Sequence, residues 1–188
     1  MAAPPLVTEL LPPPDPVGCC QRLEGLPYRL FLDSALAGTA VGRYSFLTAD
    51  PTAVINGKGG KTTYVDCSTD RRRDAAADPL DIMRRWIADY GFERMGGLPP
   101  FQGGAAGYVG YDWGLGLERL PSPCHDDLAM DDLVFGLYDW VVAWDHAESR
   151  SWLISTGLPE TSPASRALRA QERATDVRER LNDVTRTA

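Results

Sequence analysis

Short runs of aliphatic and aromatic residues, separated by turn residues, dominate the sequence and constrain its fold most strongly. In the first run, Tyr28, Leu30 and Leu32 alternate and therefore share one face of a strand. Gly57-Lys-Gly-Gly60 is typical of a hairpin turn, because glycine accepts positive φ angles. Strands are expected at residues 28–33, 44–47, 52–56, 61–66, 101–113, 133–145 and 151–155.

Two longer segments have helical periodicity. Asp78 is a candidate N-cap and Pro79 fits the first helical position, while Gly91 is a candidate stop. Between them, apolar residues recur at helical spacing at Leu80, Met83, Trp86, Ile87 and Tyr90. A second helix is expected from about Ser162-Pro163 to Asn182, with an apolar stripe at Ala170, Ala174, Val177, Leu181 and Val184. The pattern predicts an α+β fold with a mostly antiparallel sheet and two main helices.

The ends and loops of the domain follow from composition. Residues 1–20 are rich in proline and are expected to be an extended, partly disordered lead-in, so that the domain proper spans residues 21–188. Residues 71–77 are expected to form an exposed loop. Residues 114–132 are expected to form an acidic, proline-containing loop.

Charge and hydropathy exclude several classes of function. The chain of 188 residues carries 26 acidic and 19 basic residues, a net charge of −7, which argues against a nucleic-acid partner. No apolar run approaches the roughly 18 residues that span a bilayer. Residues 1–16 contain no basic residue and no continuous apolar run, and the four cysteines have no disulfide-framework spacing. A cytoplasmic protein without a membrane partner is therefore expected.

Motifs that suggest chemistry have simpler structural interpretations. The glycine-rich run at residues 101–112 lacks G-x-G-x-x-G and G-K-[ST], so it predicts close backbone packing in a strand, not phosphate binding. Cys124-His-Asp-Asp127 is consecutive and cannot converge on one ion, so no metal site is expected. His146 lies in a predicted turn, and no local signature supplies a serine or cysteine partner. No catalytic residue and no cofactor are expected in this chain.

One pair of segments is a better candidate for ligand binding. Asp33-Ser34 ends the first strand, and Arg43-Tyr44-Ser45 follows the next loop. A hydroxyl, a guanidinium and a phenol near one strand end could hold a small polar molecule. Two structural alternatives remain: Ser34 could cap a turn, and Arg43 could pair with Asp33 or Asp50.

Five stretches, taken together and in this order, resemble the N-terminal region of the large subunit shared by anthranilate synthase and aminodeoxychorismate synthase. They are Leu30-Phe-Leu-Asp-Ser-Ala35, Gly42-Arg-Tyr-Ser-Phe-Leu47 with Asp50-Pro51, Pro100-Phe-Gln-Gly-Gly-Ala-Ala-Gly-Tyr-Val-Gly-Tyr-Asp112, Glu118-Arg-Leu-Pro121 and Phe135-Gly-Leu-Tyr-Asp-Trp-Val-Val-Ala-Trp-Asp-His146. The resemblance covers about residues 25 to 180. The Leu-Asp-Ser and Phe-Gln-Gly-Gly versions look more like the aminodeoxychorismate branch.

The resemblance implies a function that this chain performs only in part. In the family, the region packs against a chorismate-binding domain that holds Mg²⁺ through glutamates, and ammonia comes from a glutamine amidotransferase. The region itself contributes an L-tryptophan pocket, which carries over to Ser34, Val41, Gly42, Arg43 and Tyr44. We therefore expect the non-catalytic N-terminal portion of an aminodeoxychorismate synthase component I-like enzyme, which makes 4-amino-4-deoxychorismate for 4-aminobenzoate and folate biosynthesis.

The segments typical of the chorismate domain are not in the sequence, so the chain is expected to be inactive alone, as a fragment, a truncated product or one piece of a split enzyme. Two alternatives remain: a stand-alone amino-acid-binding regulatory module, or the N-terminal part of an anthranilate synthase of tryptophan biosynthesis. A surface that meets another domain is expected to be apolar, and the isolated chain to associate. Candidates for this surface are Trp140, Trp144, Val177, Leu181 and Val184.

Overall fold

Two five-stranded antiparallel sheets form the framework of the computed structural model, which describes residues 4–34, 36, 41–90, 94–116, 118, 126 and 128–183. Sheet A has the order β1 (Leu6–Glu9), β10 (Arg150–Ser155), β9 (Trp140–Asp145), β3 (Tyr44–Thr48) and β2 (Leu30–Leu32). Sheet B has the order β6 (Arg71–Ala75), β5 (Lys61–Asp66), β4 (Ala53–Lys58), β8 (Leu133–Tyr138) and β7 (Gly104–Val109). The expected α+β class with antiparallel pairing is confirmed.

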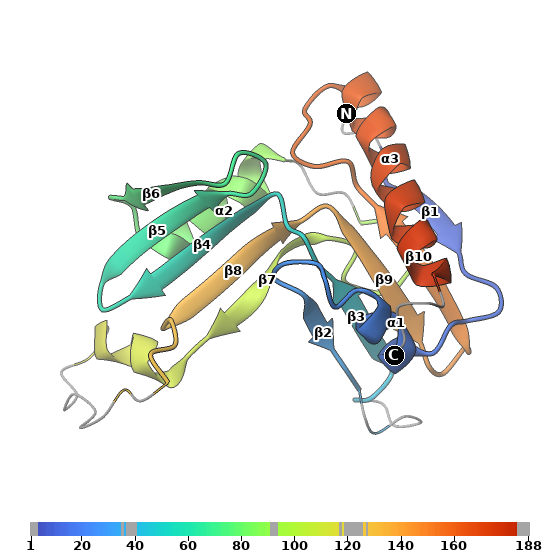
Figure 1. Cartoon of the computed structure of the whole chain (residues 1–188), viewed down its shortest axis with the longest axis horizontal. Helices are drawn as coiled ribbons and strands as arrows, with labels where there is room; N and C mark the ends of the chain where they lie inside the picture. Colours follow the sequence, from blue (N-terminus) through green and yellow to red (C-terminus); the bar gives the residue numbers. More distant parts are fainter. Residues whose placement is uncertain are drawn as a thin grey trace.

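The longer helices lie on the sheets and begin where the sequence predicts, each after a side chain that caps its N-terminus. Helix α2 (Pro79–Asp89) packs on sheet B, and α3 (Pro163–Asn182) packs on sheet A (Figure 1). The Asp78 carboxylate accepts a hydrogen bond from Leu80 N at 2.8 Å, and the Ser162 hydroxyl accepts one from Ser165 N at 3.1 Å. The expected stop of the first helix, Gly91, lies outside the described residues. A short helix α1 (Pro16–Arg22) and a 3-10 helix (Tyr111–Gly116) complete the elements, and no helix in the described part is long and apolar enough to cross a membrane.

The chain passes between the sheets at two places, and one of them was predicted incorrectly. Residues 133–145 are not one strand: β8 ends at Tyr138 in sheet B, and β9 begins at Trp140 in sheet A. Asp139 lies at the break and is fully buried. The second passage runs from β3 to β4 (Figure 1), and Asp50 is one of the residues between these two strands. The long apolar pattern concealed the break, because both halves are buried strands.

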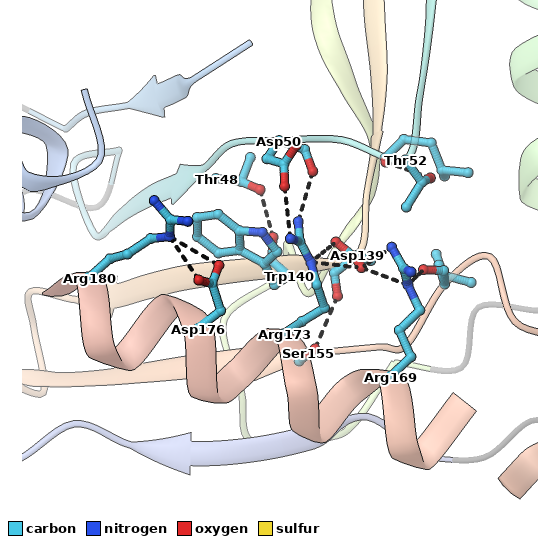
Figure 2. Close-up of polar contacts among 12 residues, drawn as sticks. Thr48, Asp50, Thr52, Asp139, Trp140, Ser155, Arg169, Arg173, Asp176 and Arg180 are labelled. Carbon is cyan, nitrogen blue, oxygen red and sulfur yellow. Dashed lines mark hydrogen bonds and ion pairs between the residues drawn. The ribbon is translucent and has the colours of Figure 1, made fainter. Parts of the chain in front are cut away.

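An ion-pair network from α3 holds both passages (Figure 2). Arg173 Nε donates to the Asp139 carboxylate at 3.2 Å, and its Nη1 and Nη2 donate to Asp50 Oδ2 and O at 2.8 Å each. Arg169 Nε donates to Asp139 Oδ2 at 3.1 Å and to Leu158 O at 2.6 Å. A buried carboxylate is costly without such partners. The network therefore couples the position of α3 to the junction of the sheets.

Two segments with loop-like composition are part of the sheets. Residues 71–75, expected to be a loop, form β6, whose backbone pairs with β5 while its arginines are exposed. An edge strand tolerates such charges and is protected by them from further pairing. Within residues 1–20, β1 pairs with β10 and α1 buries Cys19 in the core, so the expected lead-in contributes to the packed structure.

The expected apolar contact surface is wrong for every candidate that the structure describes. Trp140, Trp144, Val177 and Leu181 are buried together in the core between α3 and sheet A, and Val184 lies outside the described residues. The tryptophans of β9 face α3, because the helix stripe covers this side of the sheet. Exposed large apolar side chains occur instead at Val41, Tyr108, Val109, Tyr111, Leu128 and Met130, among others.

We predict that Asp139→Asn destabilises the protein strongly. The variant leaves Arg169 and Arg173 facing a neutral group in a buried position, and breaking a buried ion pair costs about 3 kcal/mol. Urea unfolding followed by circular dichroism measures the free energy of unfolding. Asp176→Asn is the matched control, because Asp176 pairs with Arg180 on the same helix with partial exposure, and such a pair contributes only about 0.5 kcal/mol. Equal losses in the two variants would contradict the role of Asp139.

Candidate ligand site at the start of strand β3

The pairing of β2 with β3 brings the two predicted site segments together. Leu32 lies opposite Phe46 in the antiparallel register, so the residues after β2 lie beside the first residues of β3. Ser34 Oγ donates to the Tyr44 carbonyl at 2.5 Å, and Ser34 N donates to Ser45 Oγ at 3.0 Å. Ser34 therefore bonds the backbone and a side chain of β3, which goes beyond the turn-capping alternative.

Ser45 is the centre of this site, and it joins segments that are far apart in sequence. Its side chain is buried, and its hydroxyl oxygen lies 3.0 Å from Asp33 Oδ1 and 2.7 Å from His146 Nε2. His146 follows β9, which pairs with β3 on the side opposite β2. No local motif in the sequence predicts a partner for His146. Only the pairing of β3 with β9, about 100 residues later in the chain, creates the contact.

The Ser45, His146 and Asp33 side chains do not form a hydrolytic triad. In such a triad, the carboxylate orients the histidine and the serine oxygen is open to substrate. Here Asp33 and His146 both contact the same serine oxygen, which is fully buried and also accepts the Ser34 amide. The arrangement stabilises a hydrogen-bonding surface and does not activate a nucleophile.

Arg43 makes an ion pair that neither sequence alternative named. Its Nε lies 3.0 Å from Asp145 Oδ1, and its Nη2 lies 2.7 Å from Asp145 Oδ2. The guanidinium carbon also lies 5.0 Å from the centre of the Tyr44 ring. Hydrogen bonding to Arg43 holds the pKa of the Asp145 carboxyl below its ordinary value. The pair anchors Arg43 across strands β3 and β9, because Tyr44 lies opposite Asp145 in the register.

The five predicted site residues thus have different surroundings. Ser34 and Tyr44 are in direct contact, and Gly42 is buried. Arg43 is bound to Asp145, and Val41 is 90% exposed.

Asp33 belongs to the family-like stretch Leu30-Phe-Leu-Asp-Ser-Ala35 but is not one of the five predicted site residues. Its carboxylate makes one hydrogen bond, to Ser45, among the described residues, so it keeps acceptor capacity for a ligand. A positively charged or hydroxyl group fits this position best.

The larger cavities lie elsewhere. One of about 500 Å³ lies at the junction of the sheets, between Tyr64, Tyr90 and the arginines 169 and 173. Cys67 also lines it, and burial raises the pKa of this thiol to about 11, so it stays protonated at neutral pH. A second cavity of about 500 Å³ lies beside Trp113. A smaller one of about 270 Å³ borders His146 and Asp145.

The described residues contain no group of three or more histidine, cysteine and acidic side chains that could hold a metal ion. Of the acidic run at 124–127, Cys124, His125 and Asp127 lie outside the described residues. Asp126 pairs with Lys58 at 2.6 Å. The glycine-rich run forms β7, where a Cβ atom on Gly107 would lie 1.9 Å from Val134 O. This contact confirms that the glycines allow close backbone packing.

We predict that Arg43→Met raises the pKa of Asp145 toward its ordinary value. A carboxyl whose pKa is lowered by folding contributes stability above its unfolded pKa of about 3.9 and loses it as pH falls through the folded pKa. The stability difference between the original protein and the variant should therefore be present at neutral pH and shrink in acid. The pKa is measured by NMR titration of the Asp145 side chain, and stability by urea unfolding.

Arg84→Met is the control for this prediction. Arg84 pairs with Asp81 on the exposed surface of α2 and does not contact Asp145. An unchanged Asp145 pKa in Arg43→Met would show that the ion pair does not act on this carboxyl.

Comparison with known proteins confirms the resemblance seen in the sequence, although no model of a protein family matches the chain. The chain is 32% identical over 136 residues to aminodeoxychorismate synthase component 1 of Escherichia coli, which covers 71% of this chain and 29% of that protein. It is 34% identical over 128 residues to the Bacillus subtilis protein of the same name, covering 68% and 26%. Anthranilate synthase component 1 of Acetivibrio thermocellus is 27% identical over 139 residues, covering 74% and 28%.

The fold has a similar counterpart among solved structures. The crystal structure of anthranilate synthase component I from Streptococcus pneumoniae aligns with a TM-score of 0.57 and 24% identity, covering 80% of this chain and 32% of that one. The chain spans less than a third of the length of each of these relatives.

Proposed function

We propose that the chain is the N-terminal, non-catalytic portion of an aminodeoxychorismate synthase component I-like enzyme. The observation that carries the proposal is the similarity to aminodeoxychorismate synthase component 1 of three bacteria, at 32–34% identity over 128–136 residues. The bacterial anthranilate synthases match at 27–30%. The whole enzyme would convert chorismate and ammonia to 4-amino-4-deoxychorismate, a precursor of 4-aminobenzoate and folate.

The proposed partners supply the chemistry. One is a chorismate-binding domain that holds Mg²⁺ through glutamates, and the other is a glutamine amidotransferase subunit that releases ammonia. The relatives are named as component 1 of their synthases, which supports a multi-subunit assembly. The described residues offer no carboxylate cluster suited to Mg²⁺, so the proposal assigns no metal-dependent step to this chain.

The proposed role of the site at β3 is to bind the polar end of an L-tryptophan-like amino acid. The Asp33 carboxylate is an acceptor for an α-ammonium group, and Ser34 offers hydroxyl lone pairs beside it. The backbone at residues 41–43 would face the α-carboxylate, and the exposed side chain of Val41 would contact the indole. Arg43 stays with Asp145 and shapes the site through the Tyr44 ring.

A stand-alone amino-acid-binding module is the second candidate. It is favoured by the fact that Asp33, Ser34, Ser45 and His146 organise the site within this chain. An anthranilate synthase parent would share the same site. The stand-alone module differs from the synthase portion in one respect: only the synthase portion gives activity to a chorismate-binding domain.

We predict that the chain restores amination when it is added to a chorismate-binding domain. The domain is expressed from the E. coli relative without its N-terminal region, and formation of 4-amino-4-deoxychorismate from chorismate, ammonia and Mg²⁺ is followed by chromatography. The chain alone is the control and should show no turnover. The same test with the chorismate domain of an anthranilate synthase distinguishes the branches, because the cognate branch should gain more. No gain in either mixture would contradict the proposal.

We predict that L-tryptophan binds the isolated chain and that Ser34→Ala weakens this binding about fivefold, the loss expected for one hydrogen bond of about 1 kcal/mol. Isothermal titration calorimetry measures the affinity. Ser68→Ala is the matched control, because its hydroxyl also bonds a neighbouring group, Asp66, but lies in the turn after β5, away from the site. Absence of heat with the unmodified chain would remove the tryptophan role, and equal effects of the two variants would place the ligand elsewhere.

A further inference from the structure

The Ser45 hydroxyl has three hydrogen-bond partners from two neighbouring segments. Ser34 N lies 3.0 Å from its oxygen, Asp33 Oδ1 lies 3.0 Å away, and His146 Nε2 lies 2.7 Å away. The first two partners follow β2, and the third follows β9. Ser45 is fully buried, whereas Asp33 is exposed and His146 is half-buried, so water can reach these two partners but not the Ser45 hydroxyl. The three contacts therefore share the one proton and the lone pairs of this hydroxyl.

A count of protons shows that the contacts are coupled. A serine hydroxyl donates one hydrogen bond and accepts two. The Ser34 amide uses one lone pair, so a hydroxyl proton donated to Asp33 requires His146 Nε2 to carry a proton and donate to Ser45. If Nε2 carries no proton, the hydroxyl donates to His146 instead, and Asp33 loses its hydrogen bond.

We propose that His146 is a positioning residue whose protonation weakens the binding of an amino acid's ammonium group at Asp33. This inference rests on the proposed function of the site. Protonated His146 can only donate through Nε2, so the Ser45 hydroxyl stays on Asp33. Neutral His146 can accept through Nε2, and the Asp33 lone pair that the Ser45 hydroxyl occupied is then open as well. Acidification therefore weakens binding of a cationic amino group.

Other charged groups near His146 are already paired with one another. Asp145 is bound to Arg43, and Arg150 is bound to Glu9. The imidazolium charge also repels a ligand ammonium directly, which adds to the effect. The titratable and charged groups that face or adjoin His146 are Asp33 after β2, Arg43 before and Tyr44 within β3, Asp145 and Glu148 at the turn after β9, Asp15 before α1 and Arg150 of β10.

The first test measures L-tryptophan affinity by calorimetry between about pH 5 and pH 8, the range in which histidine titrates. The amino and carboxyl groups of the ligand do not titrate in this range. The unmodified chain should lose affinity about tenfold from pH 8 to pH 5, a change of about 1.4 kcal/mol. His146→Gln keeps an amide at this position but does not titrate, so its affinity should be nearly independent of pH. His125→Gln is the control and should keep the original pH profile.

The second test reads the hydrogen bonds without ligand. The Ser34 amide donates to Ser45, so its NMR chemical shift should follow the titration of the His146 ring and become flat in His146→Gln. The two tests separate the failures. Absence of tryptophan binding at pH 8 would contradict the proposed function, whatever the amide shows. A Ser34 shift that ignores His146, or a pH profile that survives in His146→Gln, would overturn the inference.

Discussion

The buried Asp139 carboxylate is the constraint on which the arrangement of the two sheets depends. Asp139 lies at the point where the chain leaves sheet B for sheet A, and Arg169 and Arg173 of α3 neutralise it (Figure 2). Arg173 also bonds Asp50 at the other passage between the sheets. A buried carboxylate without partners would cost several kcal/mol, so α3 cannot leave its place while the junction stays intact. One helix therefore determines how the two sheets meet.

The candidate ligand site depends on the same framework indirectly, through strand β3. Strand β3 lies between β2 and β9 in sheet A, so each end of β3 faces residues from both neighbours. Its C-terminal end leads to Asp50 and the ion-pair network. Its N-terminal end carries Tyr44 and Ser45, which contact Ser34 on one side and His146 on the other. The register of β3 with β9 therefore sets the contact between Ser45 and His146.

Sequence signals were reliable where the predicted interaction joins residues that are close together in the chain. The cap at Asp78, the helix start near Ser162-Pro163 and the turn at Gly59 and Gly60 depend on interactions over a few residues, and the structure confirms them. Patterns whose structure depends on distant partners gave wrong predictions. Residues 71–75 have a loop-like composition, yet their backbone completes the edge of sheet B. The stripe of α3 was expected to meet another domain, but Trp140 and Trp144 of β9 already cover it.

The sequence by itself determined the α+β class, the boundaries of the long helices, the family resemblance and the two segments that form the candidate site. These properties follow from periodicity, capping and motif order, which are written along the chain. Only the tertiary structure decided that residues 133–145 divide between two sheets, that Arg43 pairs with Asp145, and that His146 contacts Ser45. Each of these depends on which strands pair, and strand pairing is set by burial of side chains from the whole chain at once.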